Sequence, residues 1–431
     1  MNGKPKLWII IGILILIPGA HADECEHGAL AGERYRVIVS TDIGGSDPDD
    51  FQSMIHFLMY ADLFDIEGLI SSPWDKGRKE HILQVIDRYE MDYLKLKTHS
   101  DRFPTPAYLR SITKQGEIER APSKGYRTAT EGSNWIIRCA KKDDPRPLYL
   151  LVWGLPEDVA QALHDAPEIL KKIRVIFIGG PNKKWGANAY DYIERNFPDL
   201  WMIENNSSYR GFFVGGNQSG DWGNTSFYEN HIKGHGALGE YFGNFRTGNI
   251  KMGDTPTVTY LLCGDPENPT TDSWGGRFQP APYRPKFIFN RQTNKEDLVE
   301  VFSIVEWNFT GPNQGPALDE IQFDIIIDEQ KYDGYYDGDG LYRFRWSPKS
   351  VGTYAYTIYS SLPFLHRQTG EFTCVAEGAL GHRPHEIAHK NWWTDILNPA
   401  FREGAHSGAK TTNPWREKVL RDWQNRLDWI Q

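Results

Sequence analysis

The chain has 431 residues, of which 39% are hydrophobic and 13% are aromatic. This composition supplies large packed cores and excludes a disordered protein, and the length corresponds to two or three domains. The formal net charge of -9 argues against nucleic acid as a partner, because binding to phosphates needs clustered lysine and arginine.

The first 22 residues have the organisation of a secretory signal peptide. Lys4 and Lys6 precede an apolar stretch at residues 7–18, and Ala20 and Ala22 form an A-x-A cleavage site. The stretch is too short for a membrane span, and no later segment has an apolar run as long as a bilayer requires. We therefore expect cleavage after Ala22, a secreted or periplasmic protein, and no membrane span in the mature chain.

The four cysteines show no CxxC or Cys/His spacing, which argues against a zinc site. In an exported protein they allow three disulfide pairings, and the sequence does not decide among them. Cys139 and Cys263 lie in apolar, helical stretches, where a buried free thiol is the favoured interpretation.

From residue 36 to 206, short apolar runs alternate with amphipathic stretches. The runs at 36–41, 66–71, 148–153, 175–178 and 200–203 predict strands, and the patterns at 51–60, 79–89, 134–141 and 157–164 predict helices. This alternation predicts an α/β domain with a mostly parallel sheet flanked by helices. In such sheets, ligands bind beyond the carboxyl ends of the strands.

The pattern changes after residue 285. Period-two runs rich in β-branched and aromatic residues follow one another between 287 and 375, separated by turn signals. They predict an antiparallel β-sandwich of about immunoglobulin size. Near the end of the chain an apolar stripe predicts a helix that must dock on another element.

Because the β module ends well before that last helix, we infer that the helix returns to the α/β domain. The sandwich would then be an insertion. The expected organisation is a signal peptide (1–22), an α/β domain (23–284), the inserted β-sandwich (285–377), and a return segment with the terminal helix (378–431).

The most informative motif is STDIGGSDPDD at residues 40–50. A strand runs into a glycine turn and then into a helix that Asp47 can cap, which places Asp42, Asp49 and Asp50 together at a strand's carboxyl end. The helix dipole alone accounts for acidic residues in a first helical turn. It does not account for Asp42, because crowded carboxylates repel unless a cation or proton neutralises them. Hard oxygen ligands in a flexible shell favour Ca²⁺.

This arrangement resembles the aspartate motif of nucleoside hydrolases. The longer string TDIGGSDPDDFQSMIHFLMYADLFDIEGLISS is closer to their secreted relatives, the nucleoside hydrolase-like proteins labelled cellulose-binding. Five further strings occur in the same order as in that family: LVWGLPEDVAQAL, VIFIGG, NFPDLWMIENNSSYRGFF, GDTPTVTYLL and SWGGRF. The β module resembles the immunoglobulin-like domain that precedes catalytic domains in some bacterial glycoside hydrolases.

The resemblance implies a role for each matching residue. Asp42 would be the catalytic proton acceptor, and Asp49 the second catalytic carboxylate, which holds sugar hydroxyls. The implied calcium ligands are Asp42, Asp50, the backbone carbonyl of Trp153, and Asp254. The implied sugar-binding residues are Asp49, Asn205 and Asn206.

Each of these positions also has a purely structural interpretation. Asp254 could cap a helix that starts at Thr255-Pro256, Asn205 and Asn206 could be turn residues, and Trp153 could belong to the core. Position 253 is glycine, where many family members have the histidine that protonates the leaving base.

Two functions therefore remain open. One is an exported, calcium-dependent hydrolase of N-glycosyl or related glycosyl bonds, acting on a small nucleoside or glycoside. The other is a non-catalytic protein on the same fold that binds cellulose or another polysaccharide. A homo-oligomer is compatible with both.

Overall fold

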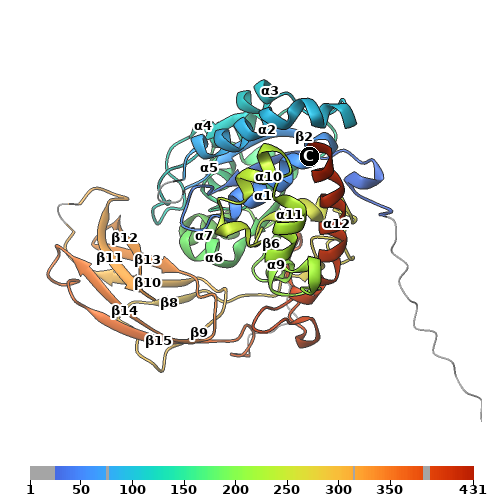
Figure 1. Cartoon of the computed structure of the whole chain (residues 1–431). Coiled ribbons are helices and arrows are strands. Elements are labelled where there is room, and N and C mark those ends of the chain that lie inside the picture. Colours follow the sequence, from blue (N-terminus) through green and yellow to red (C-terminus); the bar gives the residue numbers. More distant parts are fainter. Residues whose placement is uncertain (1–24, 74–76, 314–315, 382–388) are drawn as a thin grey trace, which may run out of the picture.

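The computed structural model describes residues 25–73, 77–313, 316–381 and 389–431 (Figure 1). The expected signal peptide lies outside the described residues. Among the helices that are described, none combines the length and the apolar character needed to cross a membrane.

The α/β domain is built on an eight-stranded sheet with the order β3-β2-β1-β4-β5-β6-β16-β7. Its strands are β1 (Arg36–Thr41), β2 (Asp65–Ser71), β3 (Thr113–Gln115), β4 (Leu148–Val152), β5 (Ile173–Ile178), β6 (Trp201–Asn205), β7 (Phe278–Pro280) and β16 (Trp392–Asp395). All neighbouring strands are parallel except β16 and β7. The predicted mostly parallel sheet is confirmed.

Strand β1 lies at the point where the strand order reverses, with β2 on one side and β4 on the other. All six of its residues are buried, as in a parallel strand covered on both faces. In doubly wound sheets the crevice beyond the carboxyl ends of the strands opens at this reversal point. The acidic motif follows β1 directly and is therefore located at that crevice.

Helices cover both faces of this sheet (Figure 1). They are α1 (Asp49–Met59), α2 (Lys79–His99), α3 (Pro106–Ser111), α4 (Glu131–Ala140), α5 (Glu157–Asp165), α6 (Gly179–Trp185), α7 (Ala187–Asn196), α8 (Gly211–Val214), α9 (Asn224–Phe227), α10 (Gly236–Phe242), α11 (Thr255–Leu262) and α12 (Arg416–Leu427). Helix α2 is longer than the predicted 79–89, because Asp92 and Leu96 continue its buried stripe.

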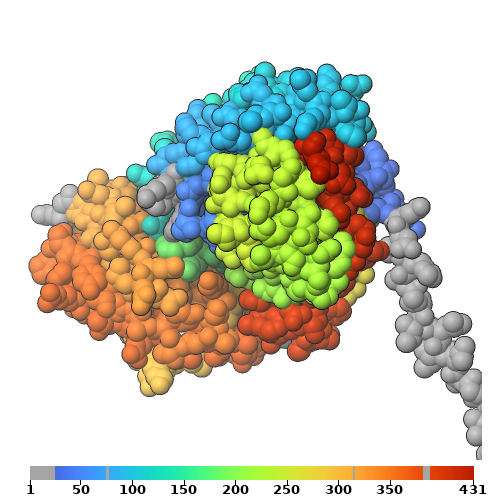
Figure 2. All heavy atoms as spheres, viewed as in Figure 1, coloured from blue at the N-terminus to red at the C-terminus, as the bar shows by residue number. Residues whose placement is uncertain are grey.

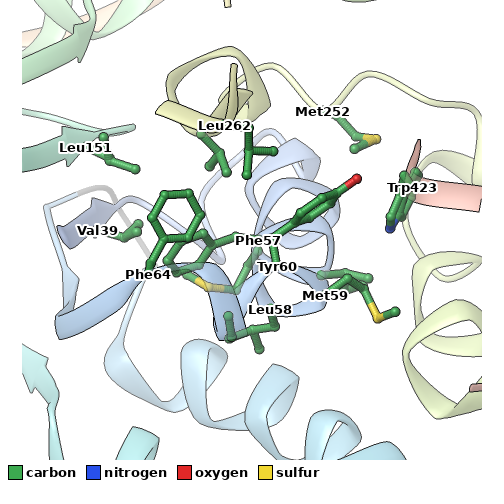
Figure 3. Packing of buried hydrophobic residues seen from close by; sticks show 14 of the residues in the cluster. Val39, Phe57, Leu58, Met59, Tyr60, Phe64, Leu151, Met252, Leu262 and Trp423 are labelled. Atoms are coloured by element: carbon green, nitrogen blue, oxygen red, sulfur yellow. The ribbon is translucent and has the colours of Figure 1, made fainter. Parts of the chain in front are cut away.

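The terminal helix α12 packs against α1, which runs next to the sheet. Trp423 is fully buried, and its ring centroid lies 5.3 Å from that of His56 on α1. Figure 3 shows Trp423 on the same side of the core as Tyr60 and Met252. Arg426 adds a buried ion pair, 2.7 Å from Asp62. This helix therefore completes the core of the α/β domain.

The β-rich region forms a second eight-stranded sheet with the order β8-β10-β13-β12-β11-β14-β15-β9. Its strands are β8 (Phe287–Phe289), β9 (Leu298–Glu300), β10 (Val305–Thr310), β11 (Ile321–Ile327), β12 (Gln330–Gly338), β13 (Leu341–Trp346), β14 (Gly352–Ser360) and β15 (Thr369–Val375). Trp307 on β10 and Phe372 on β15 come from near opposite ends of this order, yet their ring centroids are 5.4 Å apart. The sheet therefore curls around one aromatic core and is nearly closed. The predicted antiparallel β module is confirmed in this form.

The β-rich region follows β7 and precedes β16 in the chain, and it packs against α6 and α7 (Figure 1). The contact contains a buried ion network, because Arg345 lies 3.4 Å from Asp191 and 2.5 Å from Glu306. Trp185 stacks on Tyr332 with ring centroids 4.3 Å apart. These contacts fix the β-rich region beside the helices that follow β5.

Cys25 and Cys263 form a disulfide. The prediction of a free buried thiol at Cys263 is wrong, because the end of α11 lies against the N-terminal segment. The Gly264 amide donates a hydrogen bond to the His27 carbonyl there, at 3.1 Å. Cys139 and Cys374 are free and buried, so the prediction for Cys139 is confirmed.

Candidate functional site

The turn between β1 and α1 presents the acidic motif at the carboxyl edge of the sheet. Gly44 has a φ of +90°, and a Cβ at this position would overlap the His81 ring, so a glycine is required here. The Gly45 amide donates to the Asp42 carbonyl at 2.9 Å and closes the turn. Figure 2 shows the blue, early part of the chain in a hollow between the orange β-rich region and the yellow-green helices.

Three buried carboxylates converge at this turn. Asp49 and Asp50 lie in the first turn of α1, and Asp254 lies immediately before α11. One carboxylate oxygen from each of the three lies within 4.8 Å of the others. The three residues are 4–6% exposed. Two segments far apart in the sequence therefore bring their carboxylates to one point.

The helix-capping interpretations of Asp47 and Asp254 do not hold. The residue directly before α1 is Pro48 and not Asp47, and Asp254, directly before α11, makes no side-chain capping hydrogen bond in the described part of the chain. Asp47 instead forms an ion pair with Lys251. Asp254 Oδ2 is buried and has no hydrogen-bond partner among the described residues.

Asp42, directly after β1, adjoins this group, but among the described residues it is not one of the carboxylates whose oxygens all lie within 4.8 Å of one another. It is half-buried and lies beside Gly154, where a Cβ would be 2.8 Å from the Asp42 Cβ. Burial, and then the charge of Asp49, raise the pKa of Asp42 to about 7. Asp50 accepts a hydrogen bond from the Thr41 hydroxyl, which links it to β1.

The four carboxylates disfavour one another's ionisation. Burial is the largest cause of their raised pKa values, and it raises the pKa of Asp49 to about 6. Burial followed by the neighbouring aspartates raises the pKa of Asp50 and of Asp254 well above the usual range. Such a group needs protons or a cation. Oxygen-only donors with an unpartnered buried carboxylate oxygen fit a hard divalent cation such as Ca²⁺.

Trp153 follows β4, next to the acidic group. Its backbone carbonyl accepts a hydrogen bond from Asn182 Nδ2. Its indole nitrogen donates to Thr257 Oγ1 on α11 at 2.7 Å, and the ring is fully buried. The side chain therefore ties β4 to the helix that follows Asp254, while the carbonyl keeps one lone pair free of the Asn182 contact.

Asn205 and Asn206 at the end of β6 have different partners. Asn205 Oδ1 accepts from the Tyr209 amide at 2.9 Å, as a turn residue does. Asn206 Nδ2 donates to Glu204 Oε1 at 2.9 Å, while its buried Oδ1 has no partner among the described residues. Although burial opposes ionisation, Arg284 and Lys183 hold the pKa of Glu204 at about 2. Glu204 therefore acts as a fixed acceptor that orients Asn206.

Two features of the site were missed by the sequence analysis. Lys251 Nζ lies 3.1 Å from Asp49 Oδ2, which places a cation beside the acidic group. A Cβ at Gly253 would overlap Asp49 Oδ2, so Asp49 occupies the space in front of this glycine. No spacing rule in the sequence indicates either contact, since both depend on the packing of the loop before α11 against α1.

One family description covers most of the α/β domain. "Cellulose-binding Sde182, nucleoside hydrolase-like domain" matches residues 36–278. The chain belongs to this family. The matched residues of the Sde182 family contain the acidic motif, both asparagines and Asp254. A second description, a domain of unknown function (DUF5060), matches residues 298–361 within the β-rich region.

Solved structures with the nucleoside hydrolase fold are similar to this Sde182-family chain. A nucleoside hydrolase-related protein from Saccharophagus degradans, described as associated with carbohydrate metabolism, is 22% identical over 80% of this chain and 100% of its own, with a TM-score of 0.49. An inosine-uridine preferring nucleoside hydrolase from Bacillus anthracis is 15% identical over 57% of this chain and 85% of its own, with a TM-score of 0.35. A purine-preferring ribonucleoside hydrolase from Gardnerella vaginalis is 14% identical over 58% and 83%, with a TM-score of 0.33. Comparison with curated proteins finds no match.

Proposed function

We propose that the protein is an exported, calcium-dependent hydrolase of N-glycosyl or related glycosyl bonds. The observation that carries the proposal is the convergence of Asp49, Asp50 and Asp254 within 4.8 Å at the carboxyl edge of a doubly wound sheet. Purely structural carboxylates would be paired or solvated, whereas Asp254 Oδ2 is buried and has no partner within the described ranges. Among the described residues, Lys251 neutralises only part of the charge of this site.

Calcium would be held by Asp42, Asp50 and Asp254, with the Trp153 carbonyl as a further oxygen ligand. When bound, the ion would supply positive charge that lowers the pKa of a water molecule. Asp42 is half-buried at the end of β1 and would accept the proton of the attacking water. General base catalysis of this kind is typically worth about 10²–10⁴-fold.

The sugar would lie between Asp49 and Asn206. Asp49 is held by Lys251, and its carboxylate accepts hydrogen bonds that sugar hydroxyls could donate. Asn206 Oδ1 is a second acceptor, with no partner in the part of the chain that the structure describes. Asn205 is occupied by the Tyr209 amide, so its contribution would be to shape the turn. Fixed carboxylate and amide oxygens stabilise positive charge that develops on a sugar ring.

The leaving group would not be protonated from position 253. The space in front of Gly253 is filled by Asp49, and a histidine there would displace this carboxylate. This arrangement suits a purine nucleoside poorly. It fits better with a glycoside whose leaving group needs no protonation by the protein, or is protonated from another part of the cleft.

A second candidate is a non-catalytic protein that binds cellulose or another glycan. The family description itself, which is cellulose-binding, favours it. In this case the acidic group would hold an ion that orders the binding surface, and no bond would be cleaved.

A hydrolysis screen separates the two candidates. The full chain is assayed on nucleosides and aryl glycosides with Ca²⁺ and with EGTA, beside Asp42→Asn and the exposed control Asp101→Asn. If the protein is an enzyme, Asp42→Asn should lower kcat at least 100-fold, EGTA should abolish activity, and Asp101→Asn should have no effect. Bound Ca²⁺ in calorimetry with no hydrolysis of any substrate would contradict the proposal and favour the glycan-binding protein.

A further inference from the structure

A cavity of about 480 Å³ lies between the α/β domain and the β-rich region. Its lining comes from the turn after β6, from residues 301–302 and 349–351 of the β-rich region, and from residues 397–407 before α12. Gly180 and Asn206 are among its lining residues. A Cβ on Gly180 would be 2.9 Å from Tyr209 Oη, and the Tyr209 ring is next to Gly253. The cavity therefore adjoins the acidic site.

Three cations line this cavity without acidic partners. Arg210 is half-buried, Lys349 and Arg402 are exposed, and none of them forms an ion pair within 4.0 Å in the described part of the chain. Of the described lining residues, Glu377 is the acidic one, and it lies 2.6 Å from Arg284. The charge of Glu377 is thus already balanced, and the cavity carries an excess of positive charge.

The positive groups are close enough to oppose one another. Partial desolvation lowers the pKa of Lys349, and the charge of Arg210 lowers it further, while the charge of Asp328 opposes this shift. Burial, and then Arg210, lower the pKa of His406 in the same lining against the opposing charge of Glu403, so this ring offers a neutral hydrogen-bonding group. Like charges gathered in one cavity favour an anionic ligand.

Two further lining groups suit a sugar ring. Asn206 is 2% exposed, and its Oδ1 has no partner among the described residues. Phe302 is half-buried and has a φ of +62°, a conformation that a bulky residue rarely adopts. Its amide donates to the Pro348 carbonyl at 2.7 Å, which holds this conformation. Such strain is typical of residues positioned for a ligand, and flat aromatic rings stack on sugar faces.

We propose that this cavity binds an acidic saccharide, with its carboxylate or phosphate held by Arg210, Lys349 and Arg402 and a sugar face against Phe302. The inference rests on the proposed function in one respect, because the same ligand would extend to the acidic site through Asn206. Arginine provides paired donors that match carboxylate and phosphate oxygens. The β-rich region is then a wall of the binding site that selects the charge of the substrate.

The test measures binding and needs no turnover. Calorimetry with Ca²⁺ present is run on the full chain carrying Asp42→Asn, against a trigalacturonate, a cellotriose and glucose 6-phosphate. Two further variants are made in the Asp42→Asn background. The first carries Lys349→Gln with Arg402→Gln. The second, the matched control, carries Lys295→Gln with Arg367→Gln and removes equal charge from exposed positions of the β-rich region outside the cavity.

We expect at least one of the two acidic ligands to bind at least tenfold more tightly than cellotriose. The Lys349/Arg402 variant should lose at least tenfold of that affinity, while the control variant and the cellotriose affinity stay unchanged. Tighter binding of the uronate identifies a carboxylate ligand, and tighter binding of the sugar phosphate identifies a phosphate ligand. Equal affinities for neutral and acidic sugars, equal losses in both variants, or no saccharide binding would overturn the inference. Because Asp42→Asn is used throughout, failure of the hydrolysis screen leaves this test unaffected.

Discussion

Lys251 Nζ lies 3.1 Å from Asp49 Oδ2, and the same ammonium also pairs with Asp47. Desolvation opposes the charge of Lys251, but Asp49 and Asp47 outweigh it and raise the pKa of the lysine above its usual value. The acidic site thus contains a resident cation from the chain. It neutralises part of the charge that would otherwise attract Ca²⁺.

Replacing Lys251 should therefore strengthen calcium binding. With Lys251→Met we expect Ca²⁺ to bind about tenfold more tightly, because a positive charge a few ångströms away opposes the ion by on the order of 1–2 kcal/mol at the dielectric of a partly exposed site. Isothermal calorimetry at fixed pH measures this change. Lys251→Arg keeps the charge and should leave the affinity near that of the wild type. Weaker binding by Lys251→Met would mean that the lysine's main role is to order Asp49.

The space in front of Gly253 provides a second prediction. Gly253→Ala adds a Cβ that overlaps Asp49 Oδ2, so Asp49 must move away from Asp50 and Asp254. We expect the affinity for Ca²⁺ to fall at least tenfold while the helix content measured by circular dichroism is unchanged. Gly223→Ala is the control, since its Cβ would lie 3.0 Å from Ser226 Oγ and 3.1 Å from the Gln218 carbonyl oxygen, without the overlap found at Gly253. An unchanged affinity in Gly253→Ala would show that the nearby charge of Asp49 does not contribute to calcium binding.

The central strands were predictable because of their environment. Strands β1 and β4 are buried on both faces, so they appear in the sequence as continuous apolar runs. Strands β3, β7 and β16 were missed because each has only three or four residues. Such short strands are specified by their neighbours in the sheet rather than by their own pattern.

The candidate site could likewise be predicted only in part. The neighbourhood of Asp42, Asp49 and Asp50 follows from one continuous motif, in which a strand, a turn and a helix succeed one another. The contacts of Lys251 and Gly253 with Asp49 cross between two helices that are distant in the sequence, and no local pattern encodes them. The pairing of Cys25 with Cys263, 238 residues apart, was hidden for the same reason.

This disulfide should contribute measurably to stability. It joins the N-terminal segment to the end of α11, and a native disulfide typically contributes about 2–4 kcal/mol. We expect Cys25→Ser with Cys263→Ser to lower the free energy of unfolding in urea by this amount. Cys139→Ala, which removes a buried free thiol, serves as the control. Alkylation of the denatured, unreduced wild type at Cys139 and Cys374 alone checks the pairing, and modification of Cys25 would contradict it.

Glu157 should make stability depend on pH. This residue is 3% exposed at the start of α5, its Oε1 accepts from the Ala121 amide at 3.3 Å, and its Oε2 has no partner among the described residues. Burial raises its pKa from 4.5 to about 8. Folding therefore favours the protonated acid, so this contribution to stability is complete below pH 4.5 and is lost as the pH rises towards 8.

Glu157→Gln keeps the acceptor for Ala121 and removes the titration. Relative to the wild type, the variant should gain on the order of 2 kcal/mol of unfolding free energy between pH 5 and pH 8, which is a fraction of the value that the full pKa shift would allow. Urea denaturation at pH 5, 6.5 and 8 measures the difference, and the exposed Glu371→Gln gives the baseline for loss of one surface carboxylate. Parallel pH profiles for the wild type and Glu157→Gln would mean that Glu157 is hydrated or paired in solution, and that the α5 end of the sheet is more open than its packing indicates.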